Sequence, residues 1–175
     1  FSDIRGFTGI SEKMPSQALG YFMNDYLSRM SRIIIRNNGT VDKFIGDAIM
    51  AFWGAPKDDP MHAYKAVNAA IQMKAEAEKM THEFKKRNLP DIQIGIGINT
   101  GLMSVGNFGS NERFDYTVMG DNVNMASRLE GANKNYDTTI LMSDSTNTII
   151  SEDFFCRYID RVTVKGRKKP IDLFE

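Results

Sequence analysis

The sequence predicts an α+β fold, with an antiparallel or mixed sheet and helices packed on one face. Three observations lead to this prediction. Two long segments carry apolar residues at helical spacing, short strand-like segments lie between and after them, and some of these segments are joined by the tight turns of hairpins. With 175 residues and 42% hydrophobic content, the chain matches a single domain that can bury a core.

The first third of the chain predicts a helix followed by a hairpin. Apolar residues recur every three to four positions within residues 16–36, up to a glycine-type stop at 37–39. Residues 40–45 and 48–53 then predict two short strands. Only Gly46-Asp47 separates them, so we expect a tight turn that presents Asp47 at its tip.

A second helix and a second hairpin are expected in the middle of the chain. The helix follows Pro60 and ends near residues 88–90, where a proline terminates the pattern. Residues 92–99 alternate large apolar residues with small or polar ones, which indicates a strand. A further strand at 102–108 follows after Thr100-Gly101, and we interpret the two strands as a hairpin.

The last third predicts a helix at 121–133, a strand at 139–142, and short strands from 154 to 174 around a turn at Lys165-Gly166. The chain begins inside a strand-to-helix junction and stops within a strand-like run. We therefore expect residues 1–175 to be one domain truncated at both ends from a longer protein.

Composition excludes several classes of function. Lys plus Arg equals Asp plus Glu at 22 each, so the chain lacks the basic field of a general nucleic-acid binder. No segment approaches the ~20 apolar residues that cross a bilayer, so we expect no direct membrane insertion by this segment. The single cysteine, Cys156, excludes an internal disulfide and fits a reducing compartment. The expected location is cytoplasmic, with membrane tethering of a full-length protein left open.

Two aspartates are candidate metal ligands. Asp3 ends an apolar strand and is followed by glycines and a hydroxyl, a loop that can turn backbone N–H groups toward phosphate while the carboxylate holds a hard cation. Alone, Asp3 could equally be a turn or capping residue. Asp47 adds a second carboxylate, and two such residues suit a two-metal site with ions ~3.5–4 Å apart. Sequence position leaves open whether the two carboxylates meet.

Three strings carry a family resemblance: FSDIRGFT at 1–8, DKFIGDAIMAFWG at 42–54, and YTVMGDNVNMASRLE at 116–130. In this order and spacing they resemble the class III adenylyl and guanylyl cyclase catalytic domain, and the resemblance spans almost the whole chain. It implies a ferredoxin-like, palm-like central sheet with a strand-rich C-terminal extension. It also implies an adenylyl cyclase, which converts ATP to 3',5'-cyclic AMP and pyrophosphate.

The resemblance assigns the metal and phosphate sites. Asp3 and Asp47 match the metal-binding aspartates of the family, the backbone carbonyl of Ile4 would complete the shell, and two Mg²⁺ or Mn²⁺ ions are implied per active site. Residues 6–8 (Gly6, Phe7 and Thr8) form the phosphate-wrapping loop. Lys165 matches a phosphate-binding lysine, although it could equally be part of an ordinary basic turn.

The resemblance also assigns the residues that read the base. Lys43 matches the purine-reading position, where adenylyl cyclases carry lysine and guanylyl cyclases typically carry glutamate. Thr117 matches the second base-reading position, where many relatives have aspartate and one subgroup of adenylyl cyclases has threonine. An ammonium can donate to a ring nitrogen of adenine, and a hydroxyl can accept from its amino group.

Asn124 and Arg128 match the transition-state pair of the family, and their spacing of four places them on one helix face. Asn124 would orient the ribose and Arg128 would stabilise charge on the α-phosphate. Without the surrounding motif, Arg128 beside Glu130 would be an ordinary surface residue. One feature is missing: some relatives carry a phosphate-contacting arginine where this chain has Gly95.

In the family, the metal aspartates face the base-reading and transition-state residues across a subunit interface. Since this chain carries both sets, the resemblance implies a C2 homodimer with two shared sites. Three alternatives remain. A guanylyl cyclase is disfavoured by Lys43, an inactive nucleotide-binding regulatory domain by retention of the whole residue set, and a polymerase-like or cyclic-dinucleotide-forming domain by the Ile45-Gly46-Asp47 turn.

Overall fold

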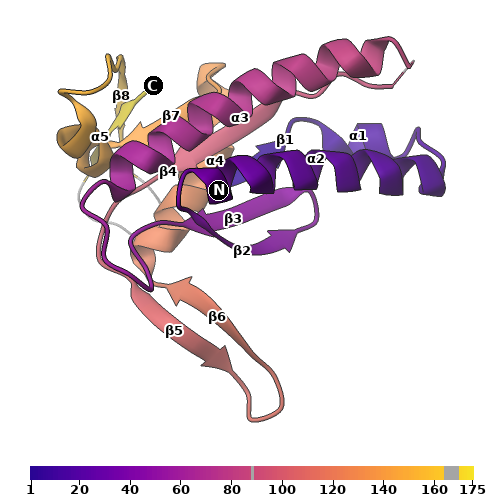
Figure 1. Cartoon of the computed structure of the whole chain (residues 1–175). Helices are drawn as coiled ribbons and strands as arrows, with labels where there is room; N and C mark the ends of the chain where they lie inside the picture. Colours follow the sequence, from indigo (N-terminus) through magenta and orange to yellow (C-terminus); the bar gives the residue numbers. More distant parts are fainter. Residues whose placement is uncertain (88, 164–169) are drawn as a thin grey trace.

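The computed structural model describes residues 1–87, 89–163 and 170–175 (Figure 1). The elements in chain order are β1 (Ser2–Ile4), α1 (Phe7–Ser11), α2 (Ser16–Arg36), β2 (Thr40–Ile45), β3 (Ala48–Phe52), α3 (His62–Lys85), β4 (Ile94–Ile98), β5 (Ser104–Gly109), β6 (Phe114–Met119), α4 (Asp121–Tyr136), β7 (Ile140–Ser143), α5 (Asp144–Ile150), β8 (Tyr158–Val162) and β9 (Ile171–Phe174).

Seven strands of the described residues form one sheet in the order β2-β3-β1-β4-β7-β9-β8. Strands β4 and β7 run parallel, and the other neighbours are antiparallel. The predicted α+β class with a mixed sheet is therefore confirmed. The first predicted hairpin is also found: Ile45 pairs with Ala48, and Gly46 between them has a φ of 65°, a conformation that favours glycine.

Helices α2 and α3 pack side by side on one face of the sheet, as the sequence predicts (Figure 1). Helix α3 packs on β4 and helix α2 on β2, and the large residues of β4 face this side because alternate residues of a strand point to the same face. The buried side chains of this main core include Phe22, Tyr26, Met30, Ile34, Met73, Met80, Phe84, Ile94 and Ile96.

Helix α4 covers the opposite face, which corrects the prediction of helices on one face only. The small residues of β4 make this possible. A Cβ atom at Gly97 would lie 2.2 Å from both the Ala126 carbonyl oxygen and the Glu130 amide nitrogen, so the backbone of α4 rests directly on the strand. Met125, Leu129 and Leu141 fill the second core beneath α4.

The second predicted hairpin is wrong. Strand β4 pairs with β1 and β7, so both of its edges are occupied, and β5 pairs instead with β6 in a separate two-stranded sheet. Figure 1 shows this β5–β6 hairpin projecting from the body. The connection at 99–103 is held open by α4, since Asn99 Nδ2 donates to the Asn122 carbonyl at 3.0 Å and Asn122 Nδ2 donates to the Leu102 carbonyl at 3.0 Å.

Several boundaries differ by a few residues from the predictions. Helix α4 continues past 133 to Tyr136, and the short helices α1 and α5 have no sequence prediction. Strands β8 and β9 confirm a strand-containing tail, whereas the turn predicted at Lys165-Gly166 lies outside the described residues. In the part of the chain that the structure describes, no helix combines the length and apolar character that crossing a membrane requires.

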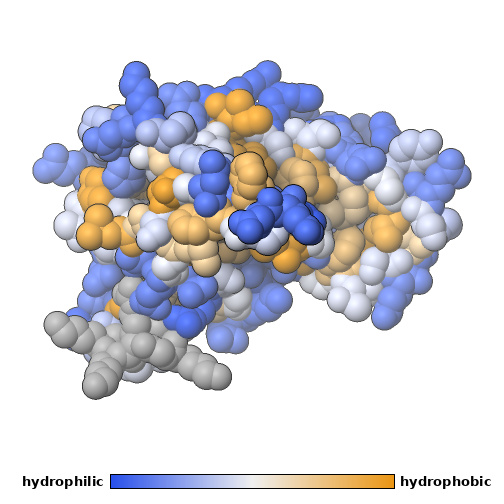
Figure 2. Space-filling model, turned by 90° about the horizontal axis from the view of Figure 1, so that it is seen from below, coloured by the Kyte–Doolittle hydropathy of each residue, from blue (hydrophilic) through white to orange (hydrophobic). Residues whose placement is uncertain are grey.

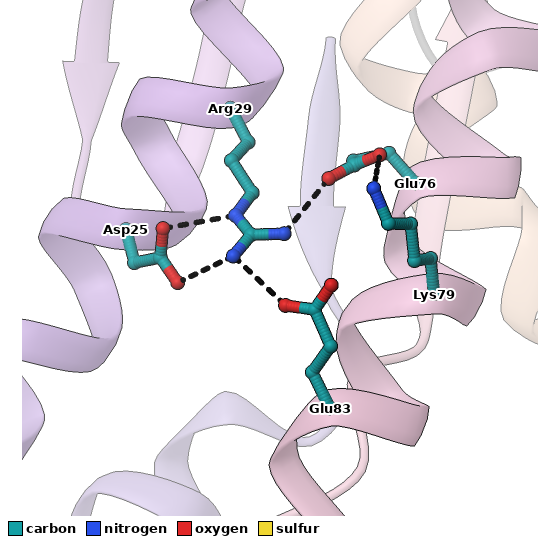
Figure 3. A network of polar contacts seen from close by, with 5 residues as sticks. All are labelled: Asp25, Arg29, Glu76, Lys79 and Glu83. Atoms are coloured by element: carbon teal, nitrogen blue, oxygen red, sulfur yellow. Dashed lines mark hydrogen bonds and ion pairs between the residues drawn. The ribbon is translucent and has the colours of Figure 1, made fainter.

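An ion-pair network joins α2 to α3 (Figure 3). The Arg29 guanidinium donates to Asp25 at 2.9 Å, to Glu76 at 3.0 Å and to Glu83 at 2.9 Å. Hydrogen bonding to these carboxylates raises the pKa of Arg29, and the same contact lowers the pKa of Glu83. A single guanidinium thus links the two helices that cover the main core.

Candidate active site

Two carboxylates lie together where β1 ends beside the turn between β2 and β3. Ser2 of β1 pairs with Ile49 of β3, so the end of β1 reaches the turn that carries Asp47. The Ile4 N–H group donates to Asp47 Oδ2 at 3.2 Å. Burial and the neighbouring carboxyl of Asp3 raise the pKa of Asp47 to about 6.

The carboxylate pair fits a divalent cation. Two partly buried carboxylates repel each other unless a positive charge lies between them. The described residues contain no group of three or more His, Cys, Asp or Glu side chains that could hold a metal. The available donors are the oxygens of Asp3 and Asp47 with nearby backbone carbonyls such as that of Ile4, and all-oxygen sets suit Mg²⁺ or Mn²⁺.

Arg5 occupies the space beside this pair on the α4 side of the sheet. Its Nη1 lies 3.7 Å from Glu130 Oε1, and its Nη2 donates to the Thr138 carbonyl at 3.4 Å. Burial and then the charge of Asp3 raise the pKa of Glu130. A Cβ atom at Gly95 would lie 2.5 Å from Arg5 Nη2, so the guanidinium of Arg5 fills the place of a side chain at position 95.

A second polar group joins β2 to β6. Lys43 Nζ lies 3.4 Å from Asp42 Oδ1 and 3.4 Å from Asp115 Oδ2. The hydroxyl of Thr117 donates a short hydrogen bond to Asp42 Oδ2. Lys43 and Thr117, which are far apart in the sequence, are therefore linked through one carboxylate.

Asp42 belongs to this polar group and is a candidate residue that the sequence predictions did not include. Its side chain is fully buried, with 0% exposure. The cause is an irregularity in the β2–β3 ladder: Val41 pairs with Ala51 and Lys43 with Met50, which leaves Asp42 as the extra residue of a bulge. A bulge can turn neighbouring side chains to the same side of a strand. The sequence gives no sign of this bulge, because an aspartate followed by a lysine is ordinary in a strand.

Asn124 and Arg128 lie one turn apart on α4. Asn124 is exposed, and Arg128 Nη1 lies 3.7 Å from Asp121 Oδ1. Gly6 precedes α1, Phe7 and Thr8 are its first residues, and this loop directly follows the carboxylate of β1. The phosphate-binding residue predicted at Lys165 lies outside the described residues.

The candidate residues thus form separate groups, some exposed, as at Asn124, and some buried, as at Thr117. Among the described residues, no hydrogen bond or ion pair joins Asp3 or Asp47 to the group on β2 and β6 or to α4. The cavity of about 340 Å³ in the body contains none of the candidate side chains; its lining is largely apolar and includes Phe52, Ala63, Val118 and Val123.

The chain matches, over residues 1–174, the family model described as the adenylate and guanylate cyclase catalytic domain. It is 41% identical over 182 residues to the adenylate cyclase of Anabaena cylindrica, covering 100% of this chain and 35% of that protein. This relative and two other curated relatives are longer proteins, of which the chain spans about a third or less.

Solved structures give the same result. The crystal structure of the adenylyl cyclase CyaB from P. aeruginosa superposes with a TM-score of 0.93 at 38% identity, over 99% of this chain and 89% of that one. The guanylyl cyclase Cya2 superposes with a TM-score of 0.88 at 32% identity, over 99% and 87%. The chain therefore belongs to the family of adenylate and guanylate cyclase catalytic domains.

Proposed function

We propose that this chain is an adenylyl cyclase catalytic domain that converts ATP to 3',5'-cyclic AMP and pyrophosphate at sites shared between two copies. The observation that carries the choice of ATP is the link between Lys43 and Thr117 through Asp42. Adenine presents a ring nitrogen that accepts and an amino group that donates. The group on β2 and β6 supplies an ammonium donor and a hydroxyl, in a relative position fixed by one carboxylate.

Guanine suits this pair poorly. Its N1–H is a donor that would face the Lys43 ammonium, and its O6 is an acceptor that would face a hydroxyl whose proton is engaged. The similarity to an adenylate cyclase and to the adenylyl cyclase CyaB supports the same choice. The similarity to the guanylyl cyclase Cya2 keeps GTP as the second candidate substrate.

Asp3, Asp47 and the Ile4 carbonyl would hold the two divalent cations. When bound, such ions lower the pKa of the ribose 3'-hydroxyl and neutralise charge on the phosphates. Arg128 places a guanidinium for the charge that develops on the α-phosphate, and Asn124, one turn away, orients the ribose. The loop at residues 6–8 and Lys165 would hold the remaining phosphates.

The reaction is an in-line displacement within one substrate molecule. The 3'-oxygen of the ribose forms a bond to the α-phosphorus, the bond from that phosphorus to the bridging oxygen breaks, and pyrophosphate leaves. The chain's residues bind, orient and stabilise charge, and no covalent intermediate with the protein is formed. Alignment of the reacting atoms is the main contribution that the protein makes.

A second copy of this chain is the partner that would complete each site. Large apolar side chains are exposed on β2 and on the β5–β6 hairpin, and Figure 2 shows apolar side chains spread around the hydrophilic tip of this hairpin. They are Phe44, Ile45, Val105, Phe108, Phe114, Tyr116 and Met119. An apolar face of this kind, next to unconnected halves of a polar site, is typical of a surface that pairs with a copy of itself.

The test is product formation by the purified chain with Mn²⁺, offering ATP and GTP in parallel and separating the nucleotides by chromatography. We expect cyclic AMP from ATP and much less cyclic GMP from GTP. Cyclic GMP as the main product would overturn the substrate assignment. A folded dimer that binds nucleotide without forming either product would indicate a regulatory nucleotide-binding domain instead.

A further inference from the structure

We propose that Asp42 sets the preference for adenine over guanine by fixing the direction of the Thr117 hydroxyl. This inference rests on the proposed function, because it concerns the base-reading part of that site. Asp42 itself is a positioning residue: its side chain is fully buried, and it acts on the base through Thr117.

The direction of the hydrogen bond between these two residues follows from their chemistry. An ionised carboxylate only accepts hydrogen bonds, whereas a hydroxyl has one proton to donate and can also accept. The Thr117 hydroxyl therefore donates its hydrogen bond to Asp42 Oδ2. What it can still offer to a ligand is a lone pair.

The Asp42 carboxylate lies beside the positive charge of Lys43. Its Oδ1 is buried without a hydrogen-bond partner among the described residues, and the ammonium of Lys43 lies 3.4 Å away. Lys43 therefore supplies a counterion for the Asp42 carboxylate. Thr117 is only 8% exposed, so no bulk water competes freely for its proton.

The consequence is a fixed polarity at one position of the site. A lone pair on Thr117 accepts from the 6-amino group of adenine and repels the 6-oxygen of guanine. If the hydroxyl could rotate freely, it would serve both bases, as an acceptor for one and a donor for the other. Asp42 removes that freedom, and discrimination of this kind comes from leaving the wrong partner unpaired.

The variant Asp42→Asn tests the inference because it keeps the size of the side chain and changes its hydrogen bonding. The amide nitrogen can donate to Thr117, which frees the hydroxyl proton for the 6-oxygen of guanine. We expect the ratio of kcat/KM for ATP over GTP to fall at least about tenfold, the effect of one hydrogen bond. Initial rates with both nucleotides at the same Mn²⁺ concentration give this ratio.

Asp115→Asn is the matched control. It removes a carboxylate that lies as far from Lys43 Nζ as Asp42 does, 3.4 Å in both cases, whereas the Thr117 hydroxyl donates to Asp42. Its side chain is 53% exposed, so we expect the ATP to GTP ratio to stay within about threefold of the starting value. In a Thr117→Val background, Asp42→Asn is expected to change the ratio no further.

The unmodified chain provides an arm that does not depend on the folding of any variant. Purine riboside triphosphate lacks the 6-amino group, so we expect its kcat/KM to be about tenfold below that of ATP. Equal use of the two nucleotides, or equal effects of Asp42→Asn and Asp115→Asn on the ratio, would overturn the inference. If the unmodified chain forms cyclic AMP but Asp42→Asn leaves the ratio of kcat/KM for ATP over GTP unchanged, the proposed function stands and the role of Asp42 is wrong. If the unmodified chain forms no cyclic nucleotide, the proposed function and the role of Asp42 are both wrong.

Discussion

Replacing Asp47 with asparagine is expected to lower the rate of cyclic nucleotide formation at least about a hundredfold, the scale of one lost electrostatic contact in a transition state. The fold should persist, because the asparagine oxygen can still accept from the Ile4 N–H group and the substitution removes a carboxylate that repels Asp3. Initial rates with ATP and Mn²⁺, together with thermal unfolding of the same preparation, measure both effects.

The matched control for this variant is Asp91→Asn. Asp91 pairs with Lys85 at 3.2 Å, and both side chains are at least half exposed. We expect its rate and melting temperature to match those of the unmodified chain. An Asp47→Asn protein that keeps more than about a tenth of the activity would remove Asp47 from the proposed metal site.

Replacing Gly97 with alanine is expected to destabilise the fold by about 2 kcal/mol or more, as overpacking of a close contact does. The added Cβ would meet the α4 backbone at 2.2 Å, and backbone atoms cannot rotate away as a side chain could. Helix α4 would have to lift from β4, and it carries Asn124 and Arg128. Urea unfolding followed by circular dichroism gives the change in the free energy of unfolding.

Gly131→Ala is the control for this prediction, because a Cβ at that position of α4 meets no atom within 4 Å. We expect it to be neutral or to stabilise the helix by about 0.5–1 kcal/mol, the usual advantage of alanine over glycine in a helix interior. If both alanine variants unfold at the same urea concentration, α4 does not pack on β4 as described.

The sequence predicts those parts of the fold that local spacing determines. Helix α2 shows a full apolar stripe, and Gly46-Asp47 permits only a tight turn, so these two predictions are confirmed. The partner of β5 could not be predicted in the same way. It depends on both edges of β4 being occupied by strands distant in the sequence, β1 and β7, and no local pattern records that.

Some residues of the candidate site can be predicted from the sequence, whereas others depend on the folded structure. Asp3, Asp47 and Lys43 lie in recognisable strings, so the sequence is sufficient to nominate them. The role of Asp42 depends on a bulge in β2 and on the position of β6 beside it, which only the folded chain reveals. Arg5 is similar, because its place over Gly95 follows from the pairing of β1 with β4.

The division of the site between two copies is the central claim, and mixing two inactive variants tests it most directly. Asp47→Asn removes a residue of the metal-binding half, and Arg128→Ala removes a residue of the transition-state half. In a C2 dimer formed from one copy of each, one of the two sites carries both defects and the other carries none.

The measurement is the rate of cyclic AMP formation after the two purified variants are unfolded together in equal amounts, refolded and supplied with ATP and Mn²⁺. Random pairing makes half of the dimers mixed, each with one intact site, so recovery of about a quarter of the activity of the unmodified chain is expected. If mixed dimers form and the rate stays at that of the separate variants, all catalytic residues act within one chain and the shared site is contradicted.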